Sequence, residues 1–147
     1  MGESMAESIM RTERMELETQ GEGQMVDITG DVARMVASAG LDEGQVLLFC
    51  TGSTGGITTI EYEPGLIQDF PELFDRIAPR DITYLHDETW HDGNGHSHCR
   101  ASLLGPSLTI PVSAGKMLLG TWQQIIFMDF DNRPRQRQLV IHLSGKV

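Results

Sequence analysis

Histidine and carboxylate side chains are concentrated in one stretch of the sequence. Four of the five histidines lie between His86 and His98, and three carboxylates lie among them. Imidazole and carboxylate groups are the usual ligands of zinc, iron, nickel and manganese, and they also act as general acids and bases. We therefore expect any chemistry of this chain in residues 86–98, with His86 and Asp92 as candidate catalytic groups.

A metal ion is one centre that this stretch could form. A strand predicted over residues 82–85 would deliver His86, and the flexible backbone at Gly93 and Gly95 would bring the later histidines back toward it. A catalytic zinc takes about three protein ligands and keeps one open position. The predicted ion is divalent, Zn²⁺ or Mg²⁺, and its predicted ligands are His86, His96 and His98.

The local backbone decides how His96 and His98 lie relative to His86. In an extended segment, side chains two residues apart point to the same face, so both imidazoles could bind one ion. In a helix they diverge by about 200°, and only one of them shares a face with His86. In the helical case His96 lies one turn before Arg100. His96 and Arg100 complete the candidate catalytic set.

Other interpretations of the histidine-rich stretch stay open. It can form an exposed polar linker, or His86 and His96 can brace a loop through hydrogen bonds. A His–Asp pair can also act as general acid and base without a metal. His91 is the least favoured member because it falls in the middle of the loop, and His142 falls in a predicted strand, which favours a structural role. The density of titratable groups favours metal binding or catalysis.

Two further segments carry groups that bind anions. Residues 51–56, TGSTGG, lack the lysine of a P-loop, but their hydroxyls and amides can form an anion-binding nest. An ordinary turn is the equal alternative there. Alternate residues of 133–137 are arginines, which suits either an exposed strand face or a phosphate contact. The candidate substrate-binding residues are Ser53, Thr54, Asn94 and Arg100.

Helices and short strands, without a regular βαβ alternation, would position these groups. The apolar spacing predicts helices over residues 31–39, capped by Thr29, over 64–77, and over a shorter segment at 96–104. Short apolar or alternating runs predict strands, the last four of them as a β-meander. The predicted strands cover residues 11–19, 45–51, 57–60, 82–85, 108–112, 117–121, 124–130 and 136–143. This pattern favours an α+β fold.

The length of 147 residues suits one domain, and we expect residues 11–147 to form it after a disordered leader at residues 1–10. No apolar run approaches the roughly 18 residues of a membrane helix, and the polar N-terminal segment is unlike a signal peptide, so a cytoplasmic protein is expected. The net charge of −10 argues against nucleic acid and membranes as partners. Cys50 and Cys99 are expected to be free thiols.

Three segments together resemble the YjbQ family. They are DGNGHSH at residues 92–98, RASLLGPSLTIP at 100–111 and GTWQ at 120–123, and the similarity extends from about Gly23 to Val140. The resemblance implies a compact α+β sandwich with two main helices and a homotrimer with sites near subunit interfaces. It also implies a histidine-lined site and a side activity as a secondary thiamine-phosphate synthase. That reaction joins hydroxymethylpyrimidine diphosphate to thiazole phosphate and releases pyrophosphate.

One position departs from the family pattern. The histidine of the family's first-loop HTxA motif aligns with Gly52, whereas His86 and residues 92–98 match the family. Two functions therefore stay open. One is a thiamine-phosphate synthase-like transferase that acts on phosphorylated small molecules with a divalent metal. The other is a homotrimer that binds a metal or small ligand without turnover. A structural or regulatory interaction protein, with Trp90 exposed, is a third alternative.

Overall fold

The computed structural model describes residues 5–147, and residues 1–4 of the predicted leader lie outside this range. The helices and strands follow one another along the chain in a mixed order. In that order they are β1 (Ser8–Thr19), β2 (Gln24–Asp27), α1 (Thr29–Ser38), β3 (Glu43–Cys50), β4 (Gly55–Ile60), α2 (Pro64–Ile77), α3 (Leu85–Trp90), α4 (Gly95–Leu104), β5 (Ser107–Ser113), β6 (Lys116–Met117), β7 (Gln124–Asp129) and β8 (Arg135–Lys146).

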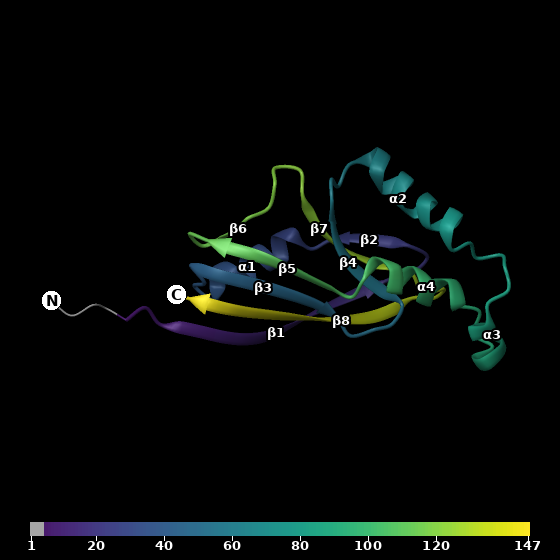
Figure 1. Ribbon diagram of the computed structural model, residues 1–147, viewed down its shortest axis with the longest axis horizontal. Coiled ribbons are helices and arrows are strands. Elements are labelled where there is room, and N and C mark those ends of the chain that lie inside the picture. The colour runs from purple at the N-terminus through teal and green to yellow at the C-terminus, as the bar shows by residue number, and fades with distance from the viewer. Residues whose placement is uncertain (1–4) are drawn as a thin grey trace.

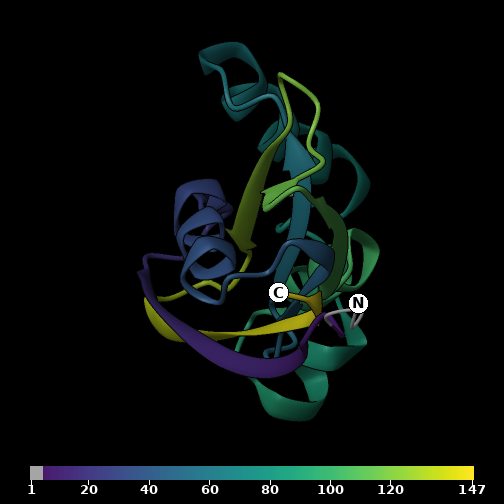
Figure 2. The ribbon, with the colours of Figure 1, turned by 90° about the vertical axis from the view of Figure 1, so that its left-hand side faces the viewer.

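The strands form two antiparallel sheets, which confirms the predicted α+β sandwich (Figure 1). The larger sheet has the strand order β1-β8-β3-β5-β6, and the smaller has the order β2-β7-β4. Figure 2 shows α1 with the long, curved strands β1 and β8 below it. The predicted C-terminal meander is wrong, because β7 leaves the larger sheet to pair with β2 and β4. Only β5 and β6 form a hairpin within that segment.

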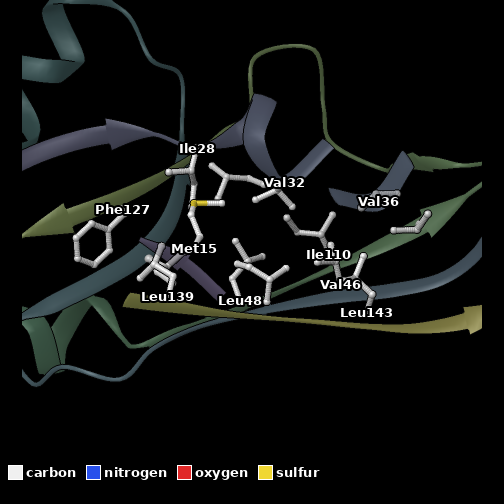
Figure 3. Packing of buried hydrophobic residues seen from close by; sticks show 14 of the residues in the cluster. Met15, Ile28, Val32, Val36, Val46, Leu48, Ile110, Phe127, Leu139 and Leu143 are labelled. Carbon is white, nitrogen blue, oxygen red and sulfur yellow. The ribbon is translucent and has the colours of Figure 1, made fainter. Parts of the chain in front are cut away.

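The main hydrophobic core lies between α1 and the inner face of the larger sheet. Val32 and Val36 are one turn apart on α1 and are almost completely buried. They face Val46 of β3 and Leu143 of β8, as Figure 3 shows. This packing explains the alternation of β3 and β8, since every second residue enters the core and its neighbours face outward.

The strand β7 is buried on both faces and joins the main core to a second apolar cluster. Ile125 and Phe127 belong to the main core, whereas Met128 packs with Phe74 of α2 and Ala101 of α4. A strand covered on both faces requires a continuous apolar run, which the sequence QIIFMD provides. The helices α2 and α4 both pack on this cluster and thereby hold the segment between them, which contains α3.

The ends of several elements differ from the prediction. β1 begins at Ser8, so residues 8–10 of the predicted leader are strand, because they pair with the last residues of β8. The helix α1 begins at Thr29 and not at residue 31. Thr29 does not cap it, because its hydroxyl donates to Asp27 and accepts from the backbone NH of Ile125. The predicted strand over 117–121 shrinks to Lys116–Met117.

The strand predicted over residues 82–85 does not form. Residues 82–84 are irregular and α3 starts at Leu85, so His86 lies on a helix. The segment turns back because the hydroxyl of Tyr84 donates to the carbonyl of Pro79 at 2.6 Å. Of the helices in residues 5–147, none has the length and apolar character needed to cross a membrane.

Candidate functional site

One cavity brings together most of the predicted site residues. It has a volume of about 400 Å³ and lies where the β3–β4 loop, the α3–α4 region and the start of β8 meet, at the right-hand end of the molecule in Figure 1. Its walls come from segments far apart in the sequence. They are Gly52, Ser53, Thr54, His86, Trp90, Asp92, Asn94, His98, Arg135 and Arg137.

The helices α3 and α4 form one wall, which we call the imidazole wall: His86, Asp92, Asn94 and His98. The rings of His86 and His98 face each other with centroids 4.2 Å apart. The Oδ1 atom of Asp92 lies 3.8 Å from Nε2 of His86. Burial and the adjacent His86 lower the pKa of His98, which keeps its ring neutral near pH 7.

The Asn94 amide links the members of the imidazole wall. With its nitrogen turned toward the cavity, it donates to Oδ1 of Asp92 at 2.9 Å and to Nε2 of His86 at 3.2 Å. The opposite orientation would offer only a 3.4 Å bond to Asp131 and would place the amide oxygen against two acceptors. We therefore assign the nitrogen to the cavity side.

Two residues with positive φ let the chain return from α3 to α4. His91 ends α3 in the left-handed conformation at φ 59°, and Gly93 follows at φ 68°. The side chain of Asp87 then accepts a hydrogen bond from the backbone NH of Gly95 at 2.8 Å. This bond ties the first turn of α4 to α3 and places His86 opposite His98.

The opposite wall, which we call the guanidinium wall, consists of Arg135 and Arg137 of β8. Arg137 forms a bidentate ion pair with Asp129, with Nε–Oδ2 and Nη2–Oδ1 distances of 2.7 and 2.8 Å. Arg135 donates from Nε to Asp131 at 2.8 Å. Both aspartates are fully buried. Burial disfavours the charge on Arg137, but its hydrogen bonds and attraction to Asp129 raise its pKa, so it stays a cation.

The Arg137 guanidinium keeps one free edge toward the cavity. Nη1 has no hydrogen-bond partner among the described residues, whereas Nη2 also donates to the Thr54 hydroxyl at 2.7 Å. A Cβ atom at Gly52 would lie 2.6 Å from Nη1, so the glycine leaves room for the guanidinium there. Thr54 also donates to Asp131 and is part of the cavity floor, while Ser53 is exposed beside it.

Two predicted site residues lie away from the cavity. α4 is helical, so His96 and Arg100 share the face opposite to His98. His96 is buried, with Nδ1 unpartnered among the described residues, and its ring lies near that of Tyr84. Arg100 donates to Ala78 O and Asp75 and thus joins α4 to the end of α2.

The three predicted histidine ligands do not lie together in this structure, since His96 is on the face of α4 opposite to His98. Within residues 5–147, no group of three or more His, Cys, Asp and Glu side chains is arranged to hold a metal ion. The nearest arrangement is His86 with Asp92, completed by the amide of Asn94. His91 is exposed at the end of α3, and His142 forms a 3.0 Å hydrogen bond with Thr12 on the neighbouring strand.

The site residues predicted from the sequence do not include Trp90, and for Arg135 and Arg137 a phosphate contact is only one of two alternatives. The alternating arginines of residues 133–137 were the available signal, because alternate residues of a strand share a face. Arg133 is exposed and is not part of the cavity wall. The sequence alone did not reveal that Asp129 and Asp131, near the end of a different strand, pair with the other two arginines.

Comparisons with known proteins agree with this architecture. The family model described as UPF0047 protein YjbQ-like matches residues 13–146. A UPF0047 protein of Archaeoglobus fulgidus is 38% identical over 125 residues, which cover 85% of this chain and 94% of that protein. The UPF0047 protein YugU of Bacillus subtilis is 33% identical over 133 residues, with 89% and 97% covered.

Solved structures of YjbQ-like proteins are also similar to this chain. A YbjQ-like protein of unknown function from Sulfolobus solfataricus has a TM-score of 0.85 and 28% identity, covering 94% of this chain and 100% of that one. A YjbQ/UPF0047 family protein from Clostridium acetobutylicum has a TM-score of 0.79 and 35% identity, covering 91% and 98%. The family match, the relatives and the shared fold lead to one conclusion: the chain belongs to the YjbQ-like UPF0047 family.

Proposed function

We propose that the chain is a metal-assisted transferase acting on phosphorylated small molecules, with the thiamine-phosphate synthase reaction as the specific activity. The observation that carries the proposal is the pairing of two unlike walls across one 400 Å³ cavity. The guanidinium wall suits the oxygens of a phosphate, and the imidazole wall suits a cation bound to that phosphate.

The proposed phosphate site consists of groups that are already charged or oriented in the structure. Arg137 is held by Asp129 and offers Nη1 beside Gly52. A guanidinium edge binds phosphate oxygens through charged hydrogen bonds. The exposed hydroxyl of Ser53 lies on the same loop and can donate a second bond.

The cation side fits a divalent ion through donors of suitable type. Nε2 of His86, the carboxylate of Asp92 and the amide of Asn94 lie 2.9–3.8 Å from one another. A half-turn of the Asn94 amide exchanges its nitrogen for its oxygen and makes all three groups acceptors. When bound, the ion would neutralise charge on the departing pyrophosphate.

The proposed reaction needs no protein nucleophile. The thiazole nitrogen supplies an electron pair to the methylene carbon of the pyrimidine, and the bond from that carbon to the diphosphate oxygen breaks. Pyrophosphate leaves with the electron pair of the broken bond. The protein's part is to orient both substrates and to hold the charged oxygens against Arg137 and Ser53. Free Cys50 and Cys99 suit the cytoplasm, to which we assign this activity.

The test measures pyrophosphate release and thiamine phosphate formation by purified protein with both substrates and Mg²⁺, Mn²⁺ or Zn²⁺. We expect turnover that chelation abolishes, and a loss of at least tenfold in Asp92→Ala. Glu88→Ala serves as the matched control, because Glu88 is an exposed carboxylate of α3 outside the cavity wall. Absence of turnover, together with no thermal stabilisation by pyrophosphate and any of these ions, would overturn the proposal.

A second candidate is a homotrimer that binds a metal or small ligand without turnover. The glycine at position 52, where the family carries a histidine, supports it. The trimer itself is supported by apolar side chains left exposed on one chain, including Ile77 at 51% and Trp122 at 71% exposure. Light scattering that gives three times the chain mass, with ligand binding but no product, would favour this candidate. A monomer would rule out the trimer of this second candidate.

A further inference from the structure

A smaller cavity adjoins the main one and shares part of its wall. It has a volume of about 210 Å³, and Gly52, Ser53 and His98 line both cavities. The remaining lining comes from the start of β4, from α4 and from the segment after α4. These residues are Gly55, Ala101, Ser102 and Pro106. We call this hollow the side cavity.

The face of α4 that carries His98 also forms the side cavity. Ala101 and Ser102 follow His98 by three and four residues, so the three side chains lie on one face of the helix. The same face continues outward into a surface hollow lined by His98, Cys99, Ser102 and Leu103. His98 therefore lines the main cavity, the side cavity and this surface hollow.

The two cavities differ in charge. The main cavity has Asp92, Arg135 and Arg137 in its wall, whereas the side cavity has no Asp, Glu, Lys or Arg among the described residues that line it. Its lining is small and mostly uncharged, with methyl, methylene and imidazole surfaces. A cavity of about 150 Å³ is large enough to hold benzene. The side cavity therefore has the size and character for one ring.

The phosphate-binding groups lie where the two cavities meet. Gly52 and Ser53 belong to both walls, and Nη1 of Arg137 points at the position that a side chain on residue 52 would take. A phosphate bound there would leave its ester substituent free to enter the side cavity. The ring of His98 would then flank that substituent on one side.

We propose that the side cavity binds the ring of the phosphorylated substrate, against His98 and Ala101, while Arg137 and Ser53 bind its phosphate. This inference rests on the proposed phosphate-binding function and adds where the rest of the molecule binds. It also assigns to substrate selection Ala101 and Ser102, which are not part of the main cavity wall.

The experiment compares inorganic phosphate with phenyl phosphate by calorimetric titration of the full chain in the presence of Mg²⁺. In the wild type we expect phenyl phosphate to bind at least about tenfold more tightly, because its ring leaves water for the side cavity. Ser102→Phe should remove that advantage by filling the side cavity, so that both ligands bind equally. Ser102 is exposed, so the variant is expected to fold, and its melting temperature without ligand checks this.

Ser38→Phe is the matched control, because Ser38 is also an exposed helical serine but lies at the end of α1, outside both cavities. It should keep the wild-type preference. Equal affinity of the wild type for the two ligands would overturn the inference and leave the proposed function standing. A wild type that binds neither ligand would overturn both. A preference that survives in Ser102→Phe would place the ring elsewhere and overturn the inference.

Discussion

The two walls of the main cavity are built in opposite ways. Arg137 is about nine-tenths buried and is fixed by two hydrogen bonds to a fully buried carboxylate. Asp92 has a side chain that is 49% exposed, and its distance of 3.8 Å to His86 is longer than a hydrogen bond. The guanidinium wall is therefore fixed by buried ion pairs, whereas the members of the imidazole wall are linked by the Asn94 amide and by the contact between the two imidazole rings.

The difference follows from the elements that carry each wall. β8 is an inner strand of the larger sheet, paired with β1 from Arg135 to Lys146 and with β3 from Leu139 to Lys146. The imidazole wall is carried by the six-residue α3, the turn after it and the start of α4. Substitutions in the first wall should therefore change stability and binding together, and substitutions in the second should change binding alone.

The largest effect is expected from Arg137→Ala. Removing the guanidinium leaves the Asp129 carboxylate buried, with the Thr19 hydroxyl as its remaining side-chain donor among the described residues. Breaking a buried ion pair in this way costs about 3–5 kcal/mol. Urea denaturation should show that loss in the free energy of unfolding. The same variant should lose phosphate binding, measured by calorimetry at a temperature where it remains folded.

Arg133→Ala is the matched control for this change. Arg133 is exposed in the turn before β8, so its loss should alter the free energy of unfolding by no more than about 0.5 kcal/mol. A loss of similar size in both variants would contradict the distinction between the walls. So would an Arg137→Ala protein as stable as the wild type.

A smaller effect is expected from Gly52→Ala. The new Cβ would lie 2.6 Å from Nη1 of Arg137, and the guanidinium cannot retreat without stretching its bonds to Asp129. Overpacking of this kind costs about 1–3 kcal/mol. We expect a loss of this size in urea denaturation, with weaker phosphate binding. Gly30→Ala, at an open position on α1, should instead be neutral or slightly stabilising, and an equal response of the two variants would contradict the explanation.

The sequence predicts the imidazole wall better than the guanidinium wall. His86, Asp92, Asn94 and His98 lie close together along the chain, so their density is evident from the order of residues alone. The helical alternative also predicts that His96 and His98 face opposite ways, but it does not say which of them meets His86. That choice depends on how α4 packs against β4 and the second apolar cluster.

The guanidinium wall depends on two strands that are near in sequence but belong to different sheets. Arg137 follows Asp129 by only eight residues, but the spacing of the C-terminal strands predicts a meander, whereas β7 lies in the smaller sheet and β8 in the larger. The long helix over 64–77 has the ends that the sequence predicts, since Pro64 begins it and Pro79 follows it. Local signals of this kind determine helix ends, whereas the choice of partner strand depends on burial across the whole fold.

The smallest predicted effect is a change in the pH dependence of the unfolding free energy. It distinguishes the buried face of α4 from the face that lines the cavity. Burial lowers the pKa of His96, and Arg100 lowers it further. The unfolded chain therefore binds a proton on this ring at a higher pH than the folded protein does. The stabilising contribution of neutral His96 is present above about pH 6.5 and is lost as the pH falls below that value.

His96→Leu should reduce the slope of unfolding free energy against pH between about 6.5 and 5, by at most about 1.4 kcal/mol per pH unit. It should keep the response to phosphate and metal, whereas His98→Leu should weaken the response to metal, because the His98 ring packs against that of His86. A His96→Leu protein with the wild-type slope, or without ligand response, would show that the buried face of α4 is not separate from the site.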